Sequence, residues 1–121
     1  MMKDKTLVLG ASTNPERYSY LAIQRLRQKG HRVLAIGGQK GEVNGVAIGT
    51  KPVTDTEVDT VTLYLNPERQ KSYYEYIFSL GPRRIIFNPG AENDELEQLA
   101  RARGIVAQEA CTLVLLGTGQ Y

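Results

Sequence analysis

Short apolar runs alternate along the chain with longer segments in which apolar residues recur every three or four positions. A short apolar run bounded by turn residues is typical of a buried parallel strand. Five such runs predict strands, at residues 5–10, 32–36, 60–65, 84–87 and 105–107. The periodic segments predict amphipathic helices at residues 15–29, 67–80 and 93–103. Strand and helix therefore alternate, which predicts an α/β fold with a doubly wound parallel sheet of about five strands and helices on both faces.

The helical spacing also predicts which side chains face the sheet. These inner positions are Tyr18, Leu21, Ala22, Leu26, Tyr73, Tyr74, Ile77, Leu80, Leu96, Leu99 and Ala100. Between the second and third strands, residues 42–48 predict a small hairpin around an Asn44-Gly45 turn. Residues 112–116 follow the fifth strand as an apolar tail.

The first strand leads into a stretch with the composition of a helix start. Gly10 permits a tight turn, and residues 12–14 are Ser, Thr and Asn, which commonly cap helices. Pro15 suits the first helical position, and Glu16 suits the first turn. A helix that starts directly after a strand presents free backbone N–H groups and a favourable dipole to an anion. This corner therefore predicts a phosphorylated nucleotide ligand.

The motif Asn-Pro-Glu-Arg occurs twice, at residues 14–17 and 66–69. Both copies predict a capped helix start after a strand. In a doubly wound sheet, ligands bind outside the carboxyl ends of the strands, so the loops 11–18, 37–40 and 66–69 are expected to meet there. The segment 88–90, after the fourth strand, is either a plain turn or a further wall of the site.

The class of ligand follows from what these loops contain. A nicotinamide fingerprint needs three glycines in the first turn and an acidic residue after the second strand. Here Gly10 stands alone, and Gly37, Gly38 and Lys40 follow the second strand without an acidic residue. A lysine at this place suits a ligand with an extra phosphate near the ribose, and both NADP and coenzyme A (CoA) have one.

Composition and charge exclude several other classes. The length of 121 residues predicts one domain over residues 1–121, with 41% hydrophobic and 23% charged residues as in ordinary globular proteins. A net charge of +2 without a basic run argues against nucleic acid as a partner. No apolar run is long enough to predict a membrane span. One cysteine, one histidine and no evident signal peptide predict a reducing, cytoplasmic location and no metal site.

The single cysteine and the single histidine both have structural explanations. Cys111 has apolar neighbours, which predicts a buried and unreactive thiol; the alternative is a mixed disulfide with the thiol of CoA. His31 stands at the amino end of the second strand, opposite the expected ligand, which predicts a structural role.

Several motifs combine in this chain: Gly-Ala-Ser at 10–12, Asn-Pro-Glu-Arg-Tyr-Ser-Tyr at 14–20, Gly-His-Arg-Val at 30–33, and the late Cys111. Together they resemble the small single-domain CoA-binding proteins, which are similar to the CoA-binding domain of the succinyl-CoA synthetase α-subunit. The resemblance covers nearly the whole chain and implies a Rossmann-like domain that binds CoA along the strand ends. Around the turn at Gly10, it implies phosphate contacts from Ser12, Thr13, Asn14, Arg17 and Tyr18, ribose-side contacts from Gly37, Gly38 and Lys40, and closure by Leu65, Asn66 and Pro67.

Three hypotheses for the function remain. The first is a non-catalytic module that binds CoA or an acyl-CoA, because no nucleophile–base pair is evident near the expected site. The second is an NADP-binding enzyme or sensor, which explains Lys40 equally well but lacks the glycines and a catalytic acid or base. The third is a ligand-free interaction protein, for example a homodimer formed through the tyrosine-bearing helix 67–80 or the apolar tail.

Overall fold

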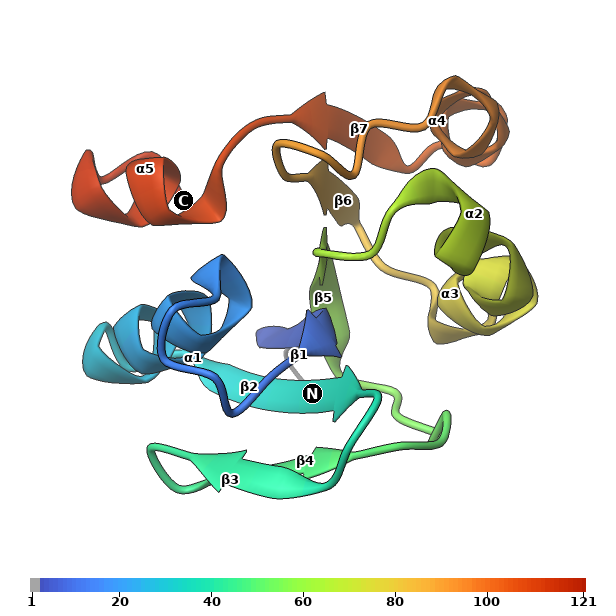
Figure 1. Cartoon of the computed structure of the whole chain (residues 1–121). Coiled ribbons are helices and arrows are strands. Elements are labelled where there is room, and N and C mark those ends of the chain that lie inside the picture. The colour runs from blue at the N-terminus through green and yellow to red at the C-terminus, as the bar shows by residue number, and fades with distance from the viewer. Residues whose placement is uncertain (1–2) are drawn as a thin grey trace.

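Seven strands form one sheet within residues 3–121, the part of the chain that the computed structural model describes. The strands are β1 (Lys5–Ala11), β2 (Arg32–Gly37), β3 (Gly41–Val43), β4 (Val46–Gly49), β5 (Val58–Leu63), β6 (Arg84–Phe87) and β7 (Val106–Glu109). Their order is β3-β4-β2-β1-β5-β6-β7, and every neighbouring pair is parallel except β3 with β4. From the central β1 the chain adds strands first on one side and then on the other (Figure 1), which confirms the doubly wound sheet.

The predicted hairpin is present, but its two strands extend the sheet, which raises the strand count from about five to seven. β4 pairs in parallel with β2, with Ala35 opposite Ile48, and β3 closes that edge as an antiparallel strand. The side chains of Val43, Val46 and Ile48 are buried. The hairpin therefore joins the sheet because its apolar face is covered there.

Helices cover both faces of the sheet, as predicted (Figure 1). α1 (Tyr18–Gln28) packs beside α5 (Thr112–Gly117) on one face, and α2 (Pro67–Gln70), α3 (Tyr74–Leu80) and α4 (Asp94–Ala102) lie on the other. A 3-10 turn at Lys71–Tyr73 joins α2 to α3, so the single helix predicted for residues 67–80 is divided into three pieces. Within residues 3–121, no helix combines the length and the apolar character that crossing a membrane requires.

Alternate side chains of β1 point into the two helical layers. Leu7 and Leu9 pack into a core shared with α3 and α4, whereas Val8 belongs to a second core shared with α1 and α5. A strand that is buried on both faces needs apolar residues at consecutive positions, which explains the run that predicted β1. The strands predicted at 60–65 and 105–107 are present as β5 and β7, with the shifted bounds given above.

α1 begins at Tyr18, three residues after the predicted start. The Asn14 side chain accepts a hydrogen bond from the Glu16 backbone N–H at 2.9 Å, and the Arg17 N–H donates to the Asn14 carbonyl at 3.0 Å. These bonds form a local turn that competes with a helical start. The prediction that residues 12–14 cap the helix is therefore wrong, and Arg17 occupies the N-cap position.

The later start also changes the inner face of α1. Tyr18 is 65% exposed, although the spacing predicted that it would face the sheet. Ser19 and Ile23 are buried instead, beside the correctly predicted Ala22 and Leu26. These four buried positions have the spacing of one helical face, so the helix itself was predicted correctly. Its inner face is rotated toward Ser19 and Ile23 and away from Tyr18.

One inner position of α4 also differs from the prediction. Leu96 and Ala100 are buried as expected, but Leu99 is exposed and Glu97 is buried. The buried side of α4 therefore includes a carboxylate, although the helical spacing predicted only apolar side chains there.

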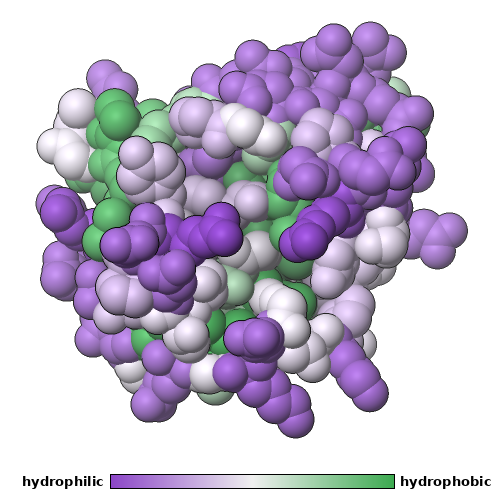
Figure 2. All heavy atoms as spheres, viewed as in Figure 1, coloured by the Kyte–Doolittle hydropathy of each residue, from purple (hydrophilic) through white to green (hydrophobic). Residues whose placement is uncertain are grey.

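The apolar tail forms α5, and part of it belongs to the chain's own core. Leu115 and Leu116 are buried, whereas Val114 is exposed. Figure 2 shows hydrophobic atoms gathered on the α5 side of the molecule. Tyr73 and Tyr74 are half-buried and pack against the core, so the tyrosine-bearing segment is also engaged within this chain.

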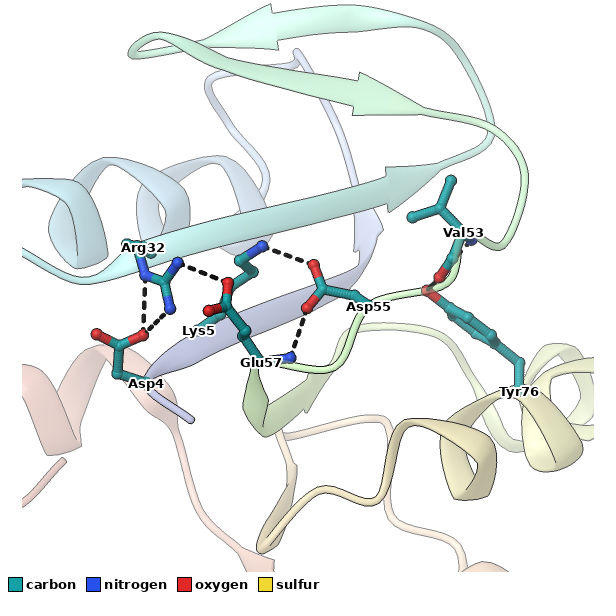
Figure 3. A network of polar contacts seen from close by, with 7 residues as sticks. All are labelled: Asp4, Lys5, Arg32, Val53, Asp55, Glu57 and Tyr76. Carbon is teal, nitrogen blue, oxygen red and sulfur yellow. Dashed lines mark hydrogen bonds and ion pairs between the residues drawn. The ribbon is translucent and has the colours of Figure 1, made fainter. Parts of the chain in front are cut away.

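Charged side chains tie the segment before β5 to the amino edge of the sheet (Figure 3). Lys5 of β1 donates to Asp55 at 2.6 Å, and Asp55 also accepts from the Glu57 backbone N–H at 2.8 Å. Arg32 of β2 bridges Asp4 and Glu57, with 2.9 Å between its guanidinium and the Glu57 carboxylate. Ion pairs therefore attach the segment that connects β4 to β5 to strands β1 and β2.

We expect acid to weaken this attachment. Burial opposes the charged form of Asp55, but the hydrogen bonds from Lys5 and the Glu57 N–H outweigh it and lower the pKa of the carboxyl. A lowered folded-state pKa stabilises the fold above the ordinary aspartate pKa of about 4, and this contribution is lost as the pH falls through the lowered value. Urea unfolding between about pH 7 and about pH 3 should show a smaller acid-induced loss of unfolding free energy in Asp55→Asn than in the wild type.

The control for this experiment is Glu42→Gln, whose side chain is exposed on β3 and should leave the pH dependence unchanged. An identical pH dependence in the wild type and Asp55→Asn would contradict the expectation.

Candidate functional site

The loops that follow β1, β2 and β5 meet at the carboxyl edge of the sheet, as the sequence predicted. They surround a hollow of about 500 Å³, a size typical of small-molecule sites. Its lining comprises Gly10, Ala11, Ser12, Glu16, Arg17, Tyr18, Ser19, Gly38, Tyr64, Leu65, Arg69 and Pro89. Figure 2 shows hydrophilic side chains on both sides of a central depression in which hydrophobic atoms are visible. Because Pro89 is in the lining, the segment 88–90 is a wall of the hollow as well as a turn.

The N-terminus of α1 reaches this hollow without a side-chain cap. The Arg17 side chain at the N-cap position makes no capping hydrogen bond, and the first turn contains no acidic residue. By contrast, Asn66 caps α2 and Asn93 caps α4, each by accepting a backbone N–H. The first N–H groups of α1 lack intrahelical partners, and the positive end of the helix dipole lies beside them. A helix end in this state is suited to a phosphate.

Two arginines also line the hollow. Arg17 precedes α1, and Arg69 lies in α2. Both are exposed, and within residues 3–121 neither guanidinium forms an ion pair or a hydrogen bond with another side chain. A guanidinium is a strong and geometrically specific donor to phosphate oxygens. The repeated Asn-Pro-Glu-Arg motif therefore supplies both cations of the hollow.

A smaller hollow of about 220 Å³ adjoins the first and lies over the end of β2. Gly37 is required by the fold here, because a Cβ at this position would collide with the Ala11 carbonyl oxygen at the end of β1. Gly10, with φ of +99°, adopts a conformation that other residues rarely take. A Cβ on Gly38 would meet nothing within 4 Å, so this glycine leaves open space beside the hollow.

Tyr64 contributes an aromatic part of the lining and carries a polar group without a partner. Its hydroxyl is buried, and it neither donates nor accepts a hydrogen bond within residues 3–121. Burial raises the pKa of this hydroxyl, and the nearby Thr62 and Thr112 hydroxyls, which bond to each other at 2.8 Å, offset only part of the rise. Cys111 lies close enough to raise the pKa of Tyr64 further. The Cys111 thiol is half-buried, not fully buried as its neighbours predicted.

Two buried amide side chains hold the walls of the site in place. Asn88 donates to the Thr62 hydroxyl at 2.7 Å and to the Leu63 carbonyl at 2.9 Å, and it accepts from the Thr112 N–H at 2.9 Å. It thereby joins the end of β5 to the start of α5.

The second amide, Gln70, is fully buried in α2. Its nitrogen donates to the Leu65 carbonyl at 2.8 Å and to the Ala91 carbonyl at 2.7 Å, and its oxygen accepts from Asn93 at 2.9 Å. The loops after β5 and β6 are therefore tied to each other directly behind the hollow.

The structure brings seven of the twelve predicted ligand residues to the two hollows: Gly10, Ser12, Arg17, Tyr18, Gly37, Gly38 and Leu65. The other five, which line neither hollow, are Thr13, Asn14, Lys40, Asn66 and Pro67.

Each of those five has a position that explains its residue type. Thr13 packs against Gly41, where a Cβ would collide with the threonine methyl group. Asn14 forms the turn before α1, and Asn66 and Pro67 begin α2. Lys40 is exposed on the loop between β2 and β3.

Three residues that line the main hollow were not among the predicted ligand residues: Tyr64, Arg69 and Pro89. Loop 66–69 was expected at the site, and segment 88–90 was one of two open possibilities, but Tyr64 was not considered. The signal for Arg69 was available in the repeated motif, since it matches Arg17 position for position. Tyr64 follows the last residue of β5, and its inward direction depends on where that strand ends, which the apolar run did not define.

A hollow of similar volume, about 540 Å³, lies at the opposite, amino edge of the sheet. Its charged side chains and its tyrosine are already bonded within the chain. Lys3 donates to the Gly81 carbonyl at 2.6 Å, and Figure 3 shows that Asp55 pairs with Lys5 and that the Tyr76 hydroxyl donates to the Val53 carbonyl, at 2.8 Å. Unpaired cations are found at the carboxyl edge, which is therefore the better candidate for an anionic ligand.

The fold and the phosphate-suited corner together define a Rossmann-like binding domain. A family model described as a CoA-binding domain matches residues 4–117. The chain therefore belongs to this CoA-binding domain family, which confirms the resemblance seen in the sequence.

Solved structures support the same assignment. The crystal structure of an uncharacterized protein is 49% identical, with a TM-score of 0.95 over 100% of this chain and 99% of that one. A hypothetical protein from Pyrococcus horikoshii OT3 is 26% identical, with a TM-score of 0.78 over 93% and 80% of the two chains. A protein from Thermus thermophilus is 22% identical and has a TM-score of 0.84 over 98% and 91%, which is a likeness of fold.

The amide network leads to a prediction about stability. The substitution Asn88→Leu keeps the side chain at a similar size but removes its amide. The Thr112 N–H and the Leu63 carbonyl, which are both buried, then lose their hydrogen-bond partner. We expect a loss of about 2 to 4 kcal/mol of unfolding free energy, because each buried unsatisfied group costs roughly 1 to 3 kcal/mol. Urea unfolding at neutral pH measures this change.

The matched control is Asn66→Ala, which removes an exposed helix cap that water can replace and should cost only about 1 kcal/mol. If Asn88→Leu were no less stable than this control, the buried amide would not hold the edge of the sheet as described.

Proposed function

We propose that residues 1–121 act as a single domain that binds CoA or an acyl-CoA at the carboxyl edge of the sheet, without catalysing a reaction on it. The observation that carries this proposal is the uncapped N-terminus of α1 beside Arg17 and Arg69 on one hollow. Membership of the CoA-binding domain family supports the choice of CoA among phosphorylated ligands.

The residues of the hollow fit the charged part of such a ligand. Backbone N–H groups at Tyr18 and Ser19 begin α1, the Ser12 hydroxyl is adjacent in the lining, and the two arginines supply positive charge. Donors of this kind stabilise phosphate oxygens through charge-assisted hydrogen bonds and the helix dipole. We assign the pyrophosphate to this corner.

The remaining surface fits the organic part of CoA. Leu65, Pro89 and the ring of Tyr64 give the hollow apolar walls. The adjoining hollow over Gly37 and Gly38 extends the space along the end of β2, on the side where the ribose is expected. Lys40 lies two residues beyond Gly38 and is the cation on this loop that would face the extra phosphate.

Isothermal titration calorimetry with CoA, acetyl-CoA, NADP and ADP tests the choice of ligand. We expect CoA and acetyl-CoA to bind more tightly than NADP and ADP. Tighter binding of NADP would favour the nicotinamide alternative, and no heat from any of the four would favour an interaction protein.

Variants of the two arginines test the placement of the ligand. Arg17→Ala and Arg69→Ala should each weaken CoA binding by about 10- to 100-fold, because a hydrogen bond to a charged group contributes roughly 1.5 to 3 kcal/mol. The two side chains are exposed, so the melting temperature without ligand should stay close to that of the wild type.

Arg25→Ala serves as the matched control, because it removes an exposed arginine from the other end of α1. It changes the net charge equally and should leave the affinity for CoA unchanged. Wild-type affinity in both Arg17→Ala and Arg69→Ala would show that the ligand does not occupy this hollow.

A further inference from the structure

Three carboxylates converge at the side of the sheet formed by α4 and β7. Asp94 begins α4, Glu97 lies one turn later, and Glu109 ends β7. One carboxylate oxygen from each residue lies within 4.8 Å of those from the other two. None of the three lines either hollow at the carboxyl edge, so the cluster is separate from the proposed CoA site.

Glu97 carries a buried acceptor oxygen that no donor within residues 3–121 satisfies. The residue is only 5% exposed. One of its carboxylate oxygens accepts from Arg101 at 3.2 Å, whereas the other is buried and has no hydrogen-bond partner within residues 3–121. A buried carboxylate is costly unless it is paired or coordinates a cation. Arg101 satisfies only one of the two oxygens, so the second oxygen would be stabilised by a further cation.

The surrounding charges do not balance. Arg101 is the cation paired with Glu97, and its other bond goes to the Ala107 carbonyl at 3.4 Å. Three carboxylates thus lie together, and within residues 3–121 only Glu97 among them forms an ion pair. Their mutual repulsion would be relieved by a multiply charged cation.

We infer that Asp94, Glu97 and Glu109 form a binding site for a hard divalent cation of the size of Ca²⁺. The donor set consists of carboxylate oxygens, which suits Ca²⁺, Mg²⁺ and Mn²⁺ and lacks the nitrogen and sulfur ligands typical of zinc sites. Two ligands of one ion lie at most twice the bond length apart, which is about 5 Å for Ca²⁺ and about 4.2 Å for Mg²⁺. The three oxygens lie within 4.8 Å of one another, so small side-chain movements would bring all of them to the Ca²⁺–oxygen distance of about 2.4 Å. Ca²⁺ also tolerates an irregular set of oxygen ligands, whereas Mg²⁺ requires a nearly ideal octahedron.

The sequence did not reveal this site because Glu109 is separated from Asp94 and Glu97 along the chain, and because Asp and Glu are common surface residues. Histidine and cysteine counts predicted no metal site, and the first turn of a helix is a common place for Asp and Glu. Glu97 was not expected inside, and only the pairing of β7 with β6 brings Glu109 beside α4.

Calorimetric titration of the metal-free protein with Ca²⁺ is the test. The wild type should bind one Ca²⁺ saturably and more tightly than Mg²⁺. Asp94→Asn and Glu109→Gln should each weaken Ca²⁺ binding at least tenfold, and because both side chains are exposed, the variants should fold as the wild type does, which circular dichroism verifies. The control is Glu95→Gln, which removes the same charge from the same helical turn but faces Tyr74 instead of the cluster.

Two results would overturn the inference. One is the absence of saturable Ca²⁺ binding to the wild type up to about 10 mM, a concentration above the weak end of protein calcium affinities. The other is equal Ca²⁺ affinity in the wild type and Glu109→Gln. A failure of CoA binding would have no bearing on either result, because the two sites share none of the residues tested.

Discussion

The shape of the carboxyl edge depends on two buried amides, Asn88 and Gln70. Each makes three hydrogen bonds inside the protein, and four of the six partners are backbone groups, at the end of β5, in the loops that follow β5 and β6, and at the start of α5. Backbone groups in such loops would otherwise be buried without partners, which proteins avoid. The amides therefore allow the loops to pass over apolar strand ends and still form fixed walls. A hollow with fixed walls can bind a ligand without first ordering its own lining.

The same edge leaves one set of donors unsatisfied where a ligand can use them. Asn66 and Asn93 satisfy the starts of α2 and α4, but the turn made by Asn14 keeps its side chain from α1. The N-terminus of α1 consequently has no side-chain cap, and Arg17 and Arg69, whose guanidinium groups bond to no other side chain in the described part of the chain, lie on the same hollow. The combination of an open helix start with two arginines on one hollow concentrates anion affinity at this corner. The cluster at Asp94, Glu97 and Glu109 has the opposite charge and lies elsewhere, so the two sites would attract different ligands.

The sequence predicted the fold class and the meeting of three loops at the carboxyl edge because both follow from periodicity and strand order. It could not predict the length of each element where local hydrogen bonds compete with helix formation, as at Asn14. It placed Tyr18 inside because it assigned the wrong start to α1, and it missed Glu97 because a charged residue gives no apolar signal. The need for a glycine at position 37 also became clear only from the structure, because the end of β1 leaves no room there for a side chain. Whether a loop residue lines a hollow depends on the packing of neighbours far away in the sequence, which no local pattern contains.

The central claim is that CoA binds at the uncapped N-terminus of α1, between the loops after β1, β2 and β5. Its most direct test is an amide chemical-shift titration of the ¹⁵N-labelled protein with CoA. If CoA binds there, the largest changes will fall on the backbone N–H groups of Ser12, Tyr18, Ser19 and Gly38, with smaller changes at Leu65 and Arg69. Changes centred on the amino edge, near Asp55 and Gly81, or an absence of changes at the start of α1, would contradict it.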